Sequence, residues 1–160
     1  GRTGCGVCGA QTIEAALPAP RRVRGSRPAP EALFRALDAF DHALPMRAVN
    51  RSVHGAAFCD AQGAIRLVRE DIGRHNALDK LAGALARAGG DAREGFLLLS
   101  SRVSVELVQK ACAIRAPVLC AVSAPSALAL RLAATAGLGV AARAPEGLVF
   151  FTDPDSDGAM

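Results

Sequence analysis

Residues 70–80 read EDIGRHNALDK and connect a short apolar segment to a helical pattern. Apolar residues follow at helical spacing: Leu78, Leu81, Leu85 and Ala88. We expect Asp71 to cap this helix, which leaves three polar side chains in its first turn, namely Arg74, His75 and Asn76. Free backbone N–H groups and the helix dipole favour an anion at such a turn. The stretch therefore predicts a strand-to-helix turn where a phosphate or another anion binds.

Polar turns follow two further apolar strands, which we predict at residues 96–99 and 117–122. Continuous apolar strands are typical of a sheet that is covered on both faces. The two turns carry hydroxyl and guanidinium groups, on Ser101, Arg102, Ser104, Ser123 and Ser126. Each turn alone is compatible with an ordinary helix cap. Because ligands of open α/β sheets bind beyond the carboxyl ends of the strands, the three turns together predict one phosphate site.

The remaining pattern predicts an α/β domain over residues 30–152. A helix is expected from Pro30 to about His42, a hairpin from strands at 53–58 and 64–68, a very apolar helix up to Ala136, and a final strand pair at 138–142 and 148–152. Residues 1–29 are interpreted as a Gly-rich Cys-x-x-Cys loop and a basic, extended, solvated linker, and residues 153–160 as a frayed tail.

Composition limits the function classes. The 160 residues, 51% of them apolar, suffice for one α/β domain with a full core. Trp and Tyr are absent, which argues against a stacking-based nucleic-acid binder, and the net charge of +4 is modest and fits an anionic ligand or partner. No apolar run reaches 18 residues, so we expect no membrane-spanning helix. Five cysteines, an odd count, indicate a reducing compartment, so we expect the cytoplasm.

The cysteine pair lies at the start of the chain, where residues 1–9 read GRTGCGVCG. A zinc site needs a second ligand pair, and the other cysteines are scattered. A thioredoxin-like pair needs a strand and a helix around it. A nucleophilic or sulfur-carrying cysteine on a mobile loop, with Arg2 favouring the thiolate, fits best. We expect Cys112 and Cys120 to be core residues and Cys59 to be a small strand-end residue.

Four segments of the chain resemble the formate dehydrogenase accessory sulfurtransferase family (FdhD/NarQ). They are residues 1–9 and 70–80, as quoted, SRVSVELVQKA at 101–111 and SAPS at 123–126. The resemblance covers nearly the whole chain. Family members carry a further N-terminal portion ahead of the cysteine loop, so we expect that portion to be missing here.

The resemblance implies a sulfurtransferase. Such a protein takes sulfur as a persulfide from a cysteine desulfurase and passes it to the molybdenum bis(molybdopterin guanine dinucleotide) cofactor of formate dehydrogenase. Cys5 would carry the persulfide, with Cys8 as its partner, and the family likeness also implies a homodimer. Two alternatives remain open: a non-catalytic chaperone that holds this cofactor, and a deaminase-like module that binds nucleotides.

The fold implied by the resemblance is a three-layer α/β/α sandwich similar to that of cytidine deaminases. Those enzymes hold zinc with His-x-Glu and Pro-Cys-x-x-Cys motifs. The comparable places here read His75-Asn76-Ala77 and Ser101-Arg102-Val103-Ser104, so we expect neither zinc nor deamination. Further contacts to the cofactor are expected near the C-terminus, although the sequence departs from the family pattern there: Ala141, Ala142, Arg143, Ala144, Pro145 and Glu146.

Overall fold

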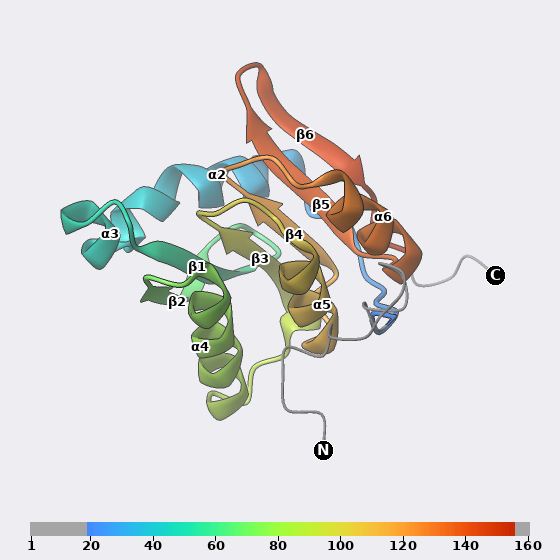
Figure 1. Ribbon diagram of the computed structural model, residues 1–160, viewed down its shortest axis with the longest axis horizontal. Helices are drawn as coiled ribbons and strands as arrows, with labels where there is room; N and C mark the ends of the chain where they lie inside the picture. The colour runs from blue at the N-terminus through green and yellow to red at the C-terminus, as the bar shows by residue number, and fades with distance from the viewer. Residues whose placement is uncertain (1–18, 156–160) are drawn as a thin grey trace, which may run out of the picture.

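A six-stranded mixed sheet lies at the centre of the computed structural model, which describes residues 19–155 (Figure 1). Its strand order is β2-β1-β3-β4-β5-β6. Strands β3, β4 and β5 are parallel, β1 runs antiparallel to both β2 and β3, and β6 runs antiparallel to β5. The bounds are β1 His54–Asp60, β2 Ile65–Asp71, β3 Gly95–Leu99, β4 Val118–Ala121, β5 Gly139–Ala144 and β6 Gly147–Thr152.

Helices cover both faces of this sheet (Figure 1). One face packs against α4 (Arg74–Arg87), α5 (Val105–Ala113) and α6 (Ala127–Ala136), and the other against α2 (Pro30–Phe40). The short elements are η1 (Asp41–Ala43), α3 (Pro45–Val49) and η2 (Ala92–Glu94). The expected arrangement of three layers is therefore present in the described residues. None of their helices is long and apolar enough to cross a membrane.

Strand β3 shows why the central strands are continuously apolar. All five of its residues are buried. Its side chains alternate between the faces, so Leu97 and Leu99 join the cluster under α4–α6, whereas Phe96 and Leu98 join the cluster under α2. A strand that is covered on both faces has no position for a polar side chain until it ends, and Ser100 follows immediately.

Three cysteines are core residues, as the sequence predicts for two of them. Cys59, Cys112 and Cys120 are completely buried, with Cys59 inside β1 and not at its end. Burial raises the pKa of the Cys59 and Cys120 thiols to about 12 and that of Cys112 to about 11. These thiols therefore stay protonated and inaccessible at neutral pH.

Two predicted helix ends are displaced by a few residues. The helix expected from Pro30 to His42 ends at Phe40 and continues as the 3-10 turn η1. The expected N-cap at Asp71 is wrong, because β2 extends to Asp71 and the N-cap of α4 is Gly73. The Asp71 carboxylate instead accepts hydrogen bonds from the Gly73 N–H at 2.9 Å and from Lys80. It fixes the turn between β2 and α4.

In the described residues 19–29, the basic segment before α2 is not a solvated linker. Val23 is 3% exposed, and its N–H donates to the carbonyl oxygen of Ala136 at 2.8 Å. Two residues later the Gly25 N–H donates to the carbonyl oxygen of Asp155 at 2.9 Å. Gly25 also lies so close to Pro117 that an added Cβ would be 2.4 Å from the proline Cβ. The segment is therefore anchored along the domain.

Candidate anion-binding site

Three helices begin at the same edge of the sheet and surround one pocket. Strands β3 and β4 are parallel, so the turns that lead from them into α5 and α6 meet beyond their carboxyl ends. Arg74 at the start of α4 joins them. The pocket has a volume of about 410 Å³ and is lined by Arg74, Arg102, Val103, Ser104, Ala124, Pro125 and Ser126. The structure thus brings together the three turns that the sequence singles out.

The backbone of this pocket favours negative charge. Ser104 is the N-cap of α5 and Ser126 the N-cap of α6, where the Ser126 hydroxyl accepts a hydrogen bond from the Ala129 N–H at 3.3 Å. The first N–H groups of a helix have no partner within the helix, and the helix dipole is positive at this end. Three such ends around one cavity form a site suited to phosphate.

The side chains add positive charge and hydrogen-bond donors without partners. Arg74 and Arg102 both line the pocket. Three buried side-chain nitrogens of the described residues have no hydrogen-bond partner, namely Nε of Arg47, Nδ1 of His54 and Nε of Arg74. Arg74 is the one of these three residues that lines the pocket, and because buried polar atoms are nearly always satisfied, its Nε points to a ligand with an acceptor atom.

His54 and Arg47 extend the cluster beyond the residues that the sequence predicts. Burial lowers the pKa of His54, and so do the positive charges of Arg47 and Arg74, so each of these two arginines lies within electrostatic range of His54. His54 opens β1, and the next residue, Gly55, donates its N–H to the Ser100 hydroxyl at 2.8 Å. Only the antiparallel pairing of β1 with β3 brings this histidine to the edge where β3 ends.

An acidic side chain lies beside the pocket, next to Ser104. His75 Nε2 lies 3.4 Å from the Ser104 hydroxyl and 3.9 Å from a carboxylate oxygen of Glu106. A hydrogen bond from Ser104 lowers the pKa of Glu106, helped by the backbone N–H of Glu106 and by the charges of His75 and Arg74. The carboxylate therefore stays ionised at neutral pH and holds Ser104 and His75 in place.

Comparison with known proteins connects this site to a family. Residues 1–155 match the sequence model of the FdhD/NarQ family. The chain belongs to this family. The match includes the cysteine loop, although Cys5 and Cys8 lie outside the residues that the structure describes.

Relatives in the family carry a sulfur-carrier name. The sulfur carrier protein FdhD of Xanthomonas campestris pv. campestris (strain B100) is 54% identical over 120 residues, which cover 74% of this chain and 43% of that protein. The protein of the same name from Burkholderia cenocepacia is 49% identical over 123 residues, covering 74% of this chain and 44% of its own length. The chain thus spans less than half the length of these relatives.

A solved structure supports the fold. The crystal structure of a protein described as a formate dehydrogenase accessory protein, from Desulfotalea psychrophila, superposes with a TM-score of 0.71 at 24% sequence identity. The superposition covers 86% of this chain and 58% of that chain. The mixed sheet with helices on both faces is therefore an architecture found in a solved structure.

Four of the predicted contact residues near the turns do not line the pocket, namely His75, Asn76, Ser101 and Ser123. Ser101 is 5% exposed, and its hydroxyl donates to the carbonyl oxygen of Arg102 at 3.1 Å. Asn76 donates to the Asp71 carboxylate at 3.3 Å. Ser123 lies in the turn before α6 but is not among the lining residues. These residues shape the turns, and contact with a ligand stays a prediction for them.

The structure does not bring residues 141–146 into the pocket either. Ala141 and Ala142 are buried within β5, and Ala141 packs in the cluster under α2. Arg143 forms an ion pair with Asp38 of α2, on the face of the sheet opposite α4–α6. The other three residues, Ala144, Pro145 and Glu146, lie at the end of β5 and in the turn to β6. Their expected role in binding therefore has no support from the pocket geometry.

Metal ligands are not assembled in the described part of the chain. Within residues 19–155 no group of three or more His, Cys, Asp or Glu side chains is placed to hold a metal ion. The residues that line the pocket offer hydroxyls and guanidinium groups, which suit an anion. For the whole chain, the absence of zinc stays a prediction.

Proposed function

We propose that this chain is part of a cytoplasmic sulfurtransferase. It would pass persulfide sulfur from a cysteine desulfurase to the molybdenum bis(molybdopterin guanine dinucleotide) cofactor of formate dehydrogenase, and work as a homodimer. The observation that carries the proposal is the pocket where three helix N-termini meet Arg74 and Arg102. Membership of the FdhD/NarQ family and the names of the relatives support the same function.

The pocket suits one guanine dinucleotide arm of this cofactor, which is the cargo of the reaction. Its volume of about 410 Å³ lies within the ordinary range of small-molecule sites, about 300–1,000 Å³. Arg74 and Arg102 would pair with phosphate oxygens, and the free N–H groups of the helix starts would donate to the same oxygens. The Ser126 hydroxyl oxygen accepts from the Ala129 N–H, which leaves its own O–H for a further hydrogen bond.

The sulfur would travel on the cysteine loop. Three of the five cysteines are buried with raised pKa values, which leaves Cys5 and Cys8 as candidates. A Cys5 thiolate that attacks the outer sulfur of a desulfurase persulfide becomes a persulfide itself and releases the desulfurase thiolate, with no net oxidation. Release of that sulfur as sulfide requires two electrons. Cys8 would supply them by forming a disulfide with Cys5, which explains the second cysteine.

The fold would be a deaminase-like sandwich adapted to this cargo. In cytidine deaminases the starts of two helices hold zinc, a His and a Glu on one and two cysteines on the other. The starts of α4 and α5 carry His75-Asn76-Ala77 and residues 101–104 here. We infer that a positively charged pocket replaces the metal centre.

Binding of GDP tests the placement of the pocket. GDP is the phosphate-bearing part of one arm of the cofactor and is titrated into the chain by calorimetry. Arg102→Ala is expected to raise the Kd by about tenfold or more, because a hydrogen bond between charged partners contributes about 1.5–3 kcal/mol. Arg87→Ala is the matched control, since Arg87 is exposed in the last turn of α4 and lies outside the pocket. Equal Kd values for Arg102→Ala and wild type would show that the ligand binds elsewhere.

A further inference from the structure

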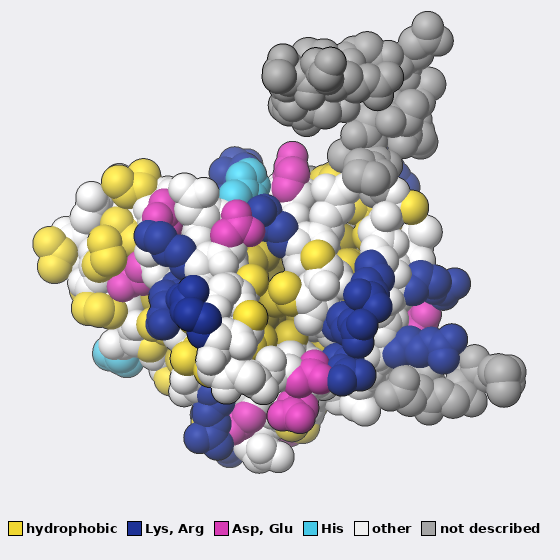
Figure 2. Space-filling model, turned by 90° about the horizontal axis from the view of Figure 1, so that it is seen from below, with side chains coloured by type: hydrophobic (Ala, Val, Ile, Leu, Met, Phe, Trp, Pro, Cys, Tyr) yellow, Lys and Arg dark blue, Asp and Glu magenta, His cyan; other side chains and the backbone are white. Residues whose placement is uncertain are grey.

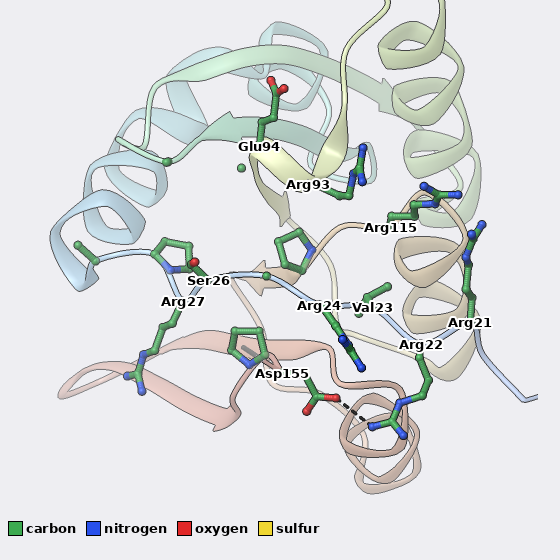
Figure 3. Close-up of a pocket in the computed structure, with 17 residues that line it drawn as sticks. Arg21, Arg22, Val23, Arg24, Ser26, Arg27, Arg93, Glu94, Arg115 and Asp155 are labelled. Atoms are coloured by element: carbon green, nitrogen blue, oxygen red, sulfur yellow. Dashed lines mark hydrogen bonds and ion pairs between the residues drawn. The ribbon is translucent and has the colours of Figure 1, made fainter. Parts of the chain in front are cut away.

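A second and larger concavity lies at the opposite edge of the sheet, where β3 and β4 begin (Figure 3). Its volume is about 1170 Å³. Its walls are the anchored segment 21–29, the residues that lead into β3 and β4, and the stretch after β6. We call it the arginine groove, because six arginines line it: Arg21, Arg22, Arg24, Arg27, Arg93 and Arg115.

Positive charge dominates this groove. Glu94 and Asp155 are the acidic residues among the lining residues, and Asp91 and Asp153 pair with lining arginines from just outside, which leaves an excess of two positive charges (6 − 4). Arg22 pairs with Asp155 at 2.9 Å, Arg27 with Asp153 at 2.9 Å, and Arg93 with Asp91. Three arginines remain without an ion-pair partner among residues 19–155, namely Arg21, Arg24 and Arg115.

The figures show how these charges are arranged. In Figure 3, Arg93 and Arg115 reach from the starts of β3 and β4, Arg21 and Arg24 come from the anchored segment, and the Glu94 carboxylate points away from them. Figure 2 shows several groups of Lys and Arg side chains, one of them on the right with acidic side chains next to it. Segment 19–29 lies on the same side of the molecule in Figure 1. The arginines of the groove therefore lie together on one side of the molecule.

The backbone holds the arginines in position. Val23 is buried, so the neighbouring Arg22 and Arg24 of this extended segment point away from the core. The hydrogen bonds of Val23 to Ala136 and of Gly25 to Asp155 fix the segment on both sides of Arg24. Charged groups on a backbone that is already ordered lose less entropy when they bind, which makes the groove a pre-organised surface.

The shape and chemistry of the groove favour an acidic polypeptide. The volume exceeds the usual range of small-molecule sites, about 300–1,000 Å³. No aromatic side chain lines it, so bases of a nucleic acid would have no stacking platform, and Arg27 already covers the Phe150 ring beside it at 3.5 Å. Guanidinium groups pair with carboxylates through two parallel hydrogen bonds.

We propose that the arginine groove binds an acidic segment of a partner protein. This binding is independent of the proposed function, because it does not require the cysteine loop to carry sulfur. One consequence does rest on the proposed function: Cys5 precedes Arg21 by 16 residues (21 − 5), at most about 58 Å of extended chain, so a docked partner lies within reach of the candidate sulfur carrier.

Fluorescence anisotropy with a labelled octaglutamate peptide tests the proposal on the 160-residue chain. The groove variant is Arg21→Gln/Arg24→Gln/Arg115→Gln. The control variant is Arg51→Gln/Arg87→Gln/Arg131→Gln, whose three exposed arginines lie outside the groove. Both variants lower the net charge from +4 to +1. The groove variant should weaken peptide binding about tenfold and the control by about twofold or less.

Each other outcome overturns the proposal. Equal loss in both variants would show general attraction between a basic protein and an acidic peptide. No binding of octaglutamate to the wild type would show that the groove is closed to such a segment. A labelled octathymidylate that binds more tightly than octaglutamate, and loses affinity in the groove variant alone, would make it a nucleic-acid site. Circular dichroism confirms that both variants are folded.

Discussion

At the scale of single residues, the environment of His54 predicts how the stability of the folded chain depends on pH. The folded chain lowers the pKa of this imidazole from its ordinary value of 6.5, through burial and through the charges of Arg47 and Arg74. The folded state therefore binds the proton more weakly than the unfolded state. The free energy of unfolding therefore keeps its full His54 contribution above pH 6.5. It decreases as the pH falls from 6.5 toward the folded-state pKa, because the unfolded chain then binds the proton more readily.

We therefore expect the His54→Gln variant to lose less stability than the wild type between pH 7.5 and pH 5.5. Urea unfolding at the two pH values measures the difference. The carboxylates whose pKa is lowered titrate below pH 5.5, so they do not contribute to the difference in stability between the two pH values. His42→Gln replaces an exposed histidine and should keep the wild-type pH dependence. Parallel changes in the wild type and His54→Gln would contradict the placement of His54 beside two arginines.

At the scale of elements, β1 and β3 approach closely at one glycine. A Cβ added to Gly95 would lie 1.9 Å from the carbonyl oxygen of Cys59 in β1. That oxygen belongs to a paired strand and moves only if the register of Cys59 with Phe96 is disturbed. Gly83 lies in the middle of α4. A Cβ added there would have its nearest neighbour, the end of the Arg87 side chain, at 3.5 Å.

The two glycines should therefore respond to alanine in opposite directions. Gly95→Ala is expected to lower the free energy of unfolding by about 3 kcal/mol, because overpacking forces the strands apart. Gly83→Ala should raise it by about 0.5–1 kcal/mol, because alanine is the better helix former. Chemical denaturation of both variants measures these changes. A Gly95→Ala variant as stable as the wild type would show that β1 and β3 are not packed this closely.

The sequence predicts the elements well because their signals are local. The apolar run of β3 and the helical spacing after Gly73 depend on near neighbours, and both elements are present. By contrast, the direction of the Arg143 side chain and the position of the anchored segment depend on packing across the sheet. Arg143 reaches α2 through its position in β5, and Val23 is buried against the end of α6. Such contacts have no local signal, so residues 141–146 and the arginine groove could not be placed from the sequence.

At the scale of the whole molecule, the sheet separates two positively charged sites. The candidate cofactor pocket lies beyond the carboxyl ends of β3 and β4, and the arginine groove lies where these strands begin. A single chain would then hold an anionic cargo at one edge and an acidic partner at the other. The cysteine loop, which precedes the groove in sequence, would connect the two roles.

The central claim is that Cys5 carries sulfur, and intact-mass spectrometry tests it most directly. The chain is incubated with a cysteine desulfurase and cysteine, and then weighed without reductant. The wild type and Cys112→Ala, which removes a buried thiol, are expected to gain one sulfur atom, and Cys5→Ala is expected to gain none. No gain in the wild type, or an unchanged gain in Cys5→Ala, would contradict the account and leave a protein that only holds the cofactor.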